Sequence, residues 1–198
     1  YFQRFGMKIL ILSLNYAPEM IGTAVYSHGM ADYLASKGHT ISVLTSHPYY
    51  PAWKVFDGWP RRRFVHTKTN EGLGPTVTYC PVYVPKSPTA AKRIAHYLSF
   101  TLSSSLSAIR KAVSKDKPNV VVVVAPSLIS ALTGILISKL SGARSWLHIQ
   151  DFEVEATFAT GLLKPNSSIG RIALAFEFWA LKRFDRVSTI SSAMLAKL

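Results

Sequence analysis

The chain contains one cysteine, Cys80, so no intrachain disulfide can form. Zinc and redox sites that need several cysteines are excluded as well, and the composition fits a reducing compartment. The sequence also lacks two nucleotide-binding motifs: the G-x-G-x-x-G fingerprint of dinucleotide-binding enzymes and the Walker loop. A phosphate site in this chain must therefore be built in another way.

Charged residues are scarce, and they are unevenly placed. They make up 17% of the chain, yet 23 lysines and arginines against 10 acidic residues give a formal net charge of +13. Residues 51–117 hold twelve of the basic residues and three of the acidic ones, a net charge of +9. Such a segment favours an anionic partner: nucleic acid, anionic lipid or a phosphorylated substrate. The alternative is a solvated surface that serves only solubility.

Residues 1–6 resemble the remnant of an expression tag, and Met7 is the expected native start. The apolar run that follows Met7 is too short for a signal peptide, since Asn15 and Pro18 interrupt it. Residues 1–6 are therefore not expected to be part of the fold.

The 198 residues, 48% of them hydrophobic, suffice for one large domain with a sizeable core. Strand and helix patterns alternate, and the run Val120–Val124 is typical of a parallel strand buried on both faces. We therefore expect an α/β fold, a Rossmann-like doubly wound parallel sheet flanked by helices. The expected strands span residues 8–14, 40–45, 63–67, 76–83, 119–125, 144–149 and 185–190. The expected helices span residues 22–37, 90–115, 128–141, 169–183 and 191–198.

Two apolar segments have alternative interpretations. Pro118–Ser138 is uncharged over 21 residues and could be mistaken for a membrane span. Pro126 interrupts it, so we favour a buried strand, a turn and a helix. In the basic helix expected at 90–115, an aliphatic stripe with helical spacing is expected to pack on the sheet. It comprises Ile94, Leu98, Leu102, Leu106, Ile109 and Val113.

Three segments carry candidate chemistry. Gly22 opens the first expected helix, where unpaired N–H groups and the helix dipole favour a phosphate. Asp151 follows the strand 144–149, at the sheet edge where open α/β sheets bind ligands. There it could accept a proton, or a hydrogen bond from a sugar hydroxyl. Alternatively, it could be only a helix N-cap or a surface carboxylate. The aromatic segment Ser46–Trp53 could stack on sugars or simply pack on its neighbours.

Nearly the whole chain resembles the N-terminal domain of GT-B glycosyltransferases of family 4, the retaining, metal-independent class. The segments that carry the resemblance are Pro18 with Gly22, residues 30–34, residues 37–45, Gln150-Asp151 and Phe184–Ser192. Ser46–Trp53 resembles the P-Y-Y-P-x-W segment of the branch that builds bacterial exopolysaccharide, O-antigen and colanic acid. The chain departs from the family at Ile21, where a second glycine is frequent. Asp151 stands where many members have histidine, although the exopolysaccharide branch has aspartate.

The resemblance implies a reaction and its partners. A sugar would pass from a nucleotide-sugar donor to a polyprenyl-diphosphate-linked saccharide, with no metal and no other cofactor. Gly22 and Thr23 would offer backbone N–H groups to the donor diphosphate, and Asp151 would be the catalytic residue. The acceptor would contact His47, Tyr49, Tyr50 and Trp53. In this family a C-terminal domain makes most donor contacts, so residues 7–198 are expected to be the acceptor-side domain and to be inactive alone.

The basic segment suggests a place in the cell. We expect a cytoplasmic protein that lies peripherally on the inner face of the cell membrane. The residues expected at the anionic surface are Arg61, Arg62, Arg63, Lys92, Arg93, Tyr97 and Phe100. The alternative is a non-catalytic basic module that binds anionic membrane or nucleic acid. No helix-turn-helix, zinc-finger or RNA-binding motif supports a nucleic-acid partner, and we expect none.

Overall fold

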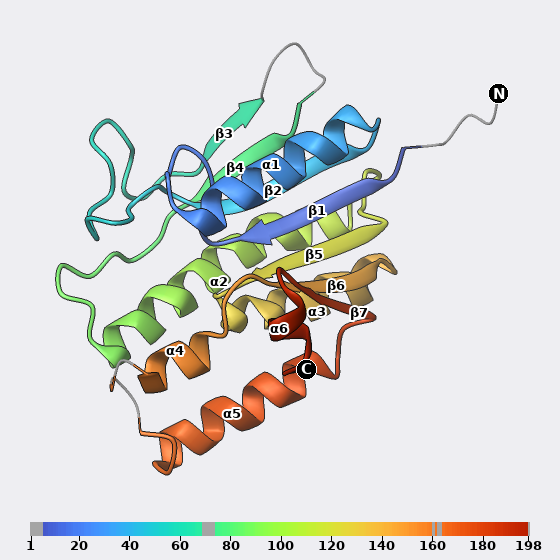
Figure 1. The fold of residues 1–198 in the computed structure, drawn as a ribbon. Coiled ribbons are helices and arrows are strands. Elements are labelled where there is room, and N and C mark those ends of the chain that lie inside the picture. Colours follow the sequence, from blue (N-terminus) through green and yellow to red (C-terminus); the bar gives the residue numbers. More distant parts are fainter. Residues whose placement is uncertain (1–5, 69–73, 160, 162–163, 198) are drawn as a thin grey trace.

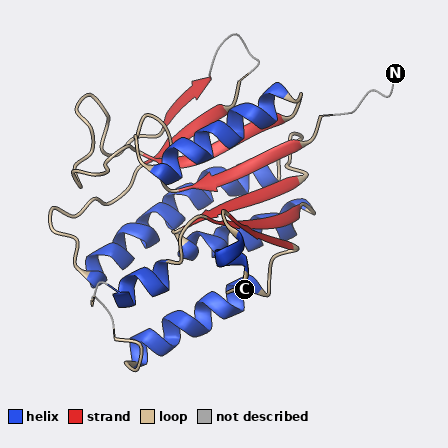
Figure 2. Cartoon of the chain, in the orientation of Figure 1, coloured by secondary structure: helices blue, strands red, loops and turns tan. Residues whose placement is uncertain are grey.

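In the computed structural model, a seven-stranded sheet is flanked by helices on both faces (Figure 1, Figure 2). The structure describes residues 6–68, 74–159, 161 and 164–197, so most of the expected tag remnant lies outside it. In sheet order the strands are β3 (Val65–Lys68), β4 (Thr76–Cys80), β2 (Thr40–Ser46), β1 (Lys8–Ser13), β5 (Val120–Ala125), β6 (Arg144–Ile149) and β7 (Arg186–Thr189). The helices are α1 (Gly22–Ser36), α2 (Ala90–Ala112), the short 3-10 helix η1 (Leu128–Ser130), α3 (Ala131–Ser141), α4 (Glu153–Ala159), α5 (Ser168–Leu181) and α6 (Ser192–Leu195).

The expected Rossmann-like α/β fold is confirmed, with the apolar strands β1 and β5 at its centre. They pair in parallel, with Leu10 opposite Val121. Because successive side chains of a strand point to opposite faces, the valine run serves two cores. Val121 and Val123 pack in the core that includes residues of α2 and α3, whereas Val122 and Val124 pack in the core on the α1 side.

Pro118–Ser138 was expected to be a buried strand, a turn and a helix, and this expectation is confirmed. The segment forms β5, η1 and α3. Within the described part of the chain, no helix combines the length and apolarity that a membrane crossing requires.

Two elements differ from expectation. β3 pairs antiparallel with β4 at the edge of an otherwise parallel sheet. Only seven residues separate these strands, whereas a parallel pair needs a crossover of roughly a dozen or more. The helix α4 was not expected, because its seven residues are too few to show a periodic pattern.

α2 turns the opposite face to the sheet from the one expected. The aliphatic stripe is exposed along its whole length: Ile94, Leu98, Leu102, Leu106, Ile109 and Val113. The buried face carries Tyr97 and Phe100 with the smaller Thr101, Ser104, Ala108 and Ala112. Small side chains allow close approach to α3, where Ser105 Oγ lies 2.8 Å from Thr133 Oγ1.

This orientation corrects two predicted membrane contacts. Tyr97 is 7% exposed and Phe100 is 0% exposed, so neither can anchor the protein at a lipid interface. Both faces of α2 have helical spacing, and spacing alone cannot say which one packs on the sheet.

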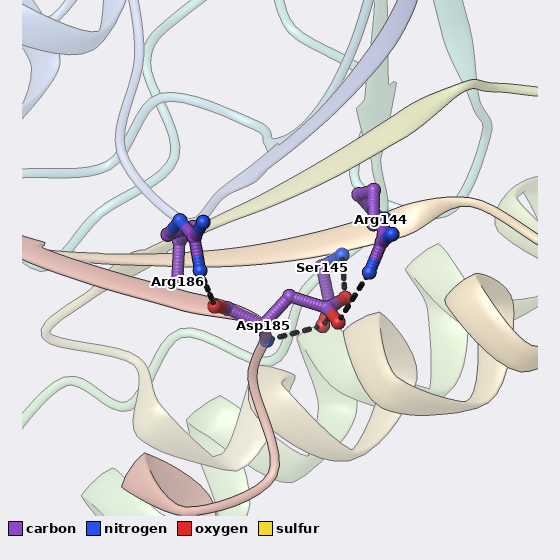
Figure 3. Close-up of polar contacts among 4 residues, drawn as sticks. All are labelled: Arg144, Ser145, Asp185 and Arg186. Atoms are coloured by element: carbon purple, nitrogen blue, oxygen red, sulfur yellow. Dashed lines mark hydrogen bonds and ion pairs between the residues drawn. The ribbon is translucent and has the colours of Figure 1, made fainter.

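A polar network joins the amino ends of β6 and β7, and Figure 3 shows it in close-up. The Asp185 carboxylate accepts hydrogen bonds from the Ser145 backbone N–H at 2.8 Å and from its hydroxyl at 2.9 Å. The Arg144 guanidinium lies 3.3 Å away. These hydrogen bonds, the Ser145 backbone bond first, lower the pKa of Asp185. The network holds the two strands in register at the edge opposite the candidate site.

Candidate functional site

A pocket of about 520 Å³ lies at the sheet edge where the parallel strands end. Residues that follow β1, β2, β5, β6 and β7 line it, together with the first two turns of α1 and of α2. Open α/β sheets bind their ligands in a crevice at the carboxyl ends of the strands.

Most of the predicted donor, acceptor and catalytic residues meet in this pocket. Those that line it are Gly22, Thr23, Tyr49, Tyr50, Trp53 and Asp151. Arg93 and Tyr97, predicted at a membrane surface, also line the pocket, which corrects their placement. The other basic residues of that prediction do not line it and are exposed: Arg61, Arg62, Arg63 and Lys92.

His47 is a predicted acceptor residue that lies away from the pocket. Its side chain is fully buried, and its Nε2–H donates to the Arg63 carbonyl oxygen at 2.8 Å. Burial lowers the pKa of His47, so the ring is neutral at pH 7. The prediction that His47 contacts the acceptor is therefore wrong. His47 instead joins the loop after β2 to the loop that contains Arg61, Arg62 and Arg63.

The start of α1 has no side-chain cap. Ile21 precedes the first helical residue and has no oxygen that could accept from the first N–H groups. A Cβ built on Gly22 would meet only the Tyr26 ring, at 4.0 Å, so packing within the protein does not require glycine here. At Gly134, by contrast, a Cβ would clash with Val123. The space beside Gly22 opens into the pocket, where a ligand could approach the backbone.

Glu19 joins the loop before α1 to the loop after β2. Its side chain is 2% exposed, and Oε1 accepts hydrogen bonds from the N–H groups of Tyr49 at 2.7 Å and Tyr50 at 2.8 Å. Oε2 accepts from Asn15 Nδ2 at 2.8 Å. Burial raises the pKa of Glu19, and the three hydrogen bonds oppose that rise. Sequence reasoning missed this residue because its partners lie 30 residues further along the chain.

Aromatic rings form the pocket wall beside α2. The Tyr49 ring lies 5.4 Å from Trp53 and 4.5 Å from His96, between centroids. Trp53 has a φ of 50°, and no other non-glycine residue of the described chain has a positive φ. Such backbone strain is frequent at ligand sites. The Arg93 guanidinium lies 6.0 Å from the Trp53 ring and donates to Tyr97 Oη at 3.3 Å. This wall offers flat apolar faces and a cation.

Gln150 and Asp151 follow β6 directly, and both line the pocket. Asp151 is exposed. Gln150 is 9% exposed, and its Oε1 has no hydrogen-bond partner among the described residues. Unpaired buried oxygens are uncommon. The exposed Asp151 carboxylate therefore places a hydrogen-bond acceptor at the strand end, and a sugar hydroxyl can donate to it.

Comparison with known proteins agrees with this architecture. Residues 22–198 match a family model described as "Glycosyl transferase 4-like domain". The chain is also 42% identical over 193 residues to an Escherichia coli (strain K12) protein, provisionally named colanic acid biosynthesis glycosyl transferase WcaI. That match covers 96% of this chain and 46% of the relative, so the chain spans about half the relative's length. The resemblance noted in the sequence is confirmed: the chain belongs to the glycosyl transferase 4-like family.

Proposed function

We propose that this chain is the acceptor-side half of a glycosyltransferase that moves a sugar from a nucleotide-sugar to a saccharide. The observation that carries the proposal is that one pocket is lined by an uncapped helix start at Gly22, an aromatic wall and the Asp151 carboxylate. Membership of the glycosyl transferase 4-like family favours an enzyme over a non-catalytic basic module. The name of the WcaI relative favours a colanic-acid-like surface polysaccharide as the product.

In this proposal the start of α1 serves the donor. The N–H groups of Gly22 and Thr23 bind the donor diphosphate, and the positive end of the helix dipole stabilises the negative charge of the departing nucleotide. The transfer then needs no metal and no further cofactor, as in the class that the resemblance implies. Most donor contacts would come from a second domain, so residues 7–198 alone would not transfer sugar.

The remaining groups serve the sugars. The rings of Tyr49, Tyr50 and Trp53 stack on the acceptor saccharide, since sugar rings present apolar C–H faces to aromatic side chains. The Asp151 carboxylate accepts a hydrogen bond from a sugar hydroxyl and orients it or takes up its proton. Gln150, beside Asp151, lies where its amide can help to orient a sugar hydroxyl.

The acceptor in this proposal is linked to a polyprenyl diphosphate, and the enzyme lies on the inner face of the cell membrane. Two observations support this finer proposal. The net charge of +13 attracts the protein to an anionic surface. Arg61, Arg62, Arg63 and Lys92 remain exposed, as such a contact requires.

Substitution at Gly22 tests the proposal. In the complete enzyme, Gly22→Val adds a branched side chain beside the helix start, where a Cβ would meet only the Tyr26 ring, at 4.0 Å. We expect kcat/KM for the nucleotide-sugar to fall at least about tenfold, measured as sugar transferred to a lipid-linked acceptor by mass spectrometry. The control is Gly29→Val on the same helix, where a Cβ would have nothing within 4 Å. Equal activity of the two variants would remove the start of α1 from the donor site.

A further inference from the structure

α2 and α3 expose aliphatic side chains on neighbouring helices. We call this set the α2–α3 face, and it comprises Ile94, Leu98, Leu102, Leu106, Ile109, Val113, Leu132, Leu136 and Leu140. Leu102 is 73% exposed and Val113 is 71% exposed. The contact between Ser105 and Thr133 brings the two helices together, and both pack on the same side of the sheet. An exposed apolar patch of this extent marks a contact surface.

The charge around the α2–α3 face identifies its partner. Apart from Arg93, which lines the pocket, residues 90–141 contain six lysines and arginines and one acidic residue, Asp116, which pairs with Lys8 at 2.9 Å. Basic residues at an apolar helix face are the pattern of an interfacial membrane helix, in which lipid phosphates meet the cations and hydrocarbon meets the leucines. A second copy of the chain would instead place two positive faces against each other.

We propose that the α2–α3 face is the surface by which the protein lies on an anionic phospholipid membrane, with the leucines inserted at the headgroup boundary. The functional meaning of this membrane contact rests on the proposed function. The first two turns of α2 carry Arg93 and Tyr97, which line the pocket. A lipid-linked acceptor held at the membrane would then meet the aromatic wall beside the same helix. Membrane contact itself is measured without any sugar transfer.

The test is vesicle co-sedimentation of the complete enzyme, with phosphatidylcholine alone and with added phosphatidylglycerol. We expect wild-type protein to bind the anionic vesicles, to bind more weakly at high salt, and to bind neutral vesicles poorly. The double variant Leu98→Ser, Leu102→Ser should lower the partition coefficient on anionic vesicles at least about fivefold. The control is Tyr33→Ser on α1, on the other side of the sheet and 61% exposed, which should bind as wild type does.

Three results would overturn the inference. Unchanged vesicle binding of the double variant would mean that the membrane contact lies elsewhere. A lower melting temperature of the double variant would mean that another part of the chain covers the face. A change of the variant from dimer to monomer in solution would assign the face to self-association. If wild-type enzyme binds vesicles through this face but transfers no sugar, the proposed function fails and the membrane inference stands.

Discussion

At the scale of single residues, the shape of the pocket depends on a buried carboxylate. Glu19 fixes the backbone of Tyr49 and Tyr50, and this sets the distance between the aromatic wall and the start of α1. Since burial raises the pKa of Glu19, its charged form is disfavoured in the fold, and its contribution to stability decreases as pH rises through that pKa. The carboxylate is therefore better explained by positioning the loops than by stabilising the fold.

If Glu19 positions the loops, the variant Glu19→Gln should lose activity without losing stability. The amide can keep the two bonds to Oε1, but its NH₂ group faces the Asn15 NH₂ group. We expect the unfolding free energy to change by less than about 1 kcal/mol, while the acceptor KM rises about tenfold. Adding Asn15→Asp restores an acceptor opposite the amide and should bring KM back. A large loss of stability with an unchanged KM would make Glu19 a purely structural residue.

His96, which supports the aromatic wall, predicts a pH dependence. It is fully buried, its Nδ1–H donates to the Tyr83 carbonyl, and burial lowers its pKa to about 4. The unfolded chain binds this proton near pH 6.5 but the folded chain does not, so the unfolding free energy falls as pH drops from 6.5 towards 4. When the pH is lowered from 7 to 4.5, the unfolding free energy of His96→Gln should fall by about 2 kcal/mol less than that of wild type, as measured by urea denaturation. Parallel pH profiles of the two proteins would contradict this assignment.

The residues of the site were predictable as far as they follow strand ends. Gly22 and Asp151 follow β1 and β6, and parallel strands bring their carboxyl ends to one edge. The directions of side chains were not predictable in this way. His47 belongs to the predicted aromatic loop and yet points into the interior, while Arg93 turns from the expected surface into the pocket. Those directions depend on contacts with residues distant in the chain.

At the scale of elements, strands were easier to predict than helix orientation. β5 was predictable because a strand buried on both faces is apolar throughout. β4 ends at Cys80, earlier than expected, since Pro81 has no N–H for the ladder. The face of α2 that is exposed could not be predicted from the spacing of its aliphatic residues. The buried face carries small side chains, which allow α2 to pack closely on α3.

The close packing of α3 on β5 predicts opposite effects of two glycine substitutions. In Gly134→Ala, the new methyl group meets Val123, and we expect a loss of about 1–3 kcal/mol in unfolding free energy. In Gly29→Ala, the methyl group has nothing within 4 Å, and better helix propensity should add about 0.5–1 kcal/mol. Chemical denaturation of both variants measures the difference. Equal stability would mean that α3 can move away from β5 at little cost.

At the scale of the whole molecule, the sheet places the residues that we propose for the donor, the acceptor and catalysis at one edge, and the outer face of α2 is exposed. The Asp185 network lies at the opposite edge, away from the pocket (Figure 3). The fold class was predictable because strand and helix patterns alternate along the chain, and the family was predictable because several family-like segments lie between Pro18 and Ser192. The antiparallel edge strand β3 contributes no residue to the pocket, and its direction does not alter the family assignment.

We propose that sugar is transferred in this pocket, and a substitution at Asp151 tests this claim. The measurement is the turnover of the complete enzyme carrying Asp151→Asn, with a nucleotide-sugar and a lipid-linked acceptor. The control is Asp57→Asn, another exposed carboxylate, whose partner is Lys54 and which lies outside the pocket. We predict that Asp151→Asn lowers kcat by about 10²- to 10⁴-fold with the fold intact, while Asp57→Asn leaves it unchanged. Wild-type turnover in Asp151→Asn would contradict the claim and reduce Asp151 to a surface carboxylate.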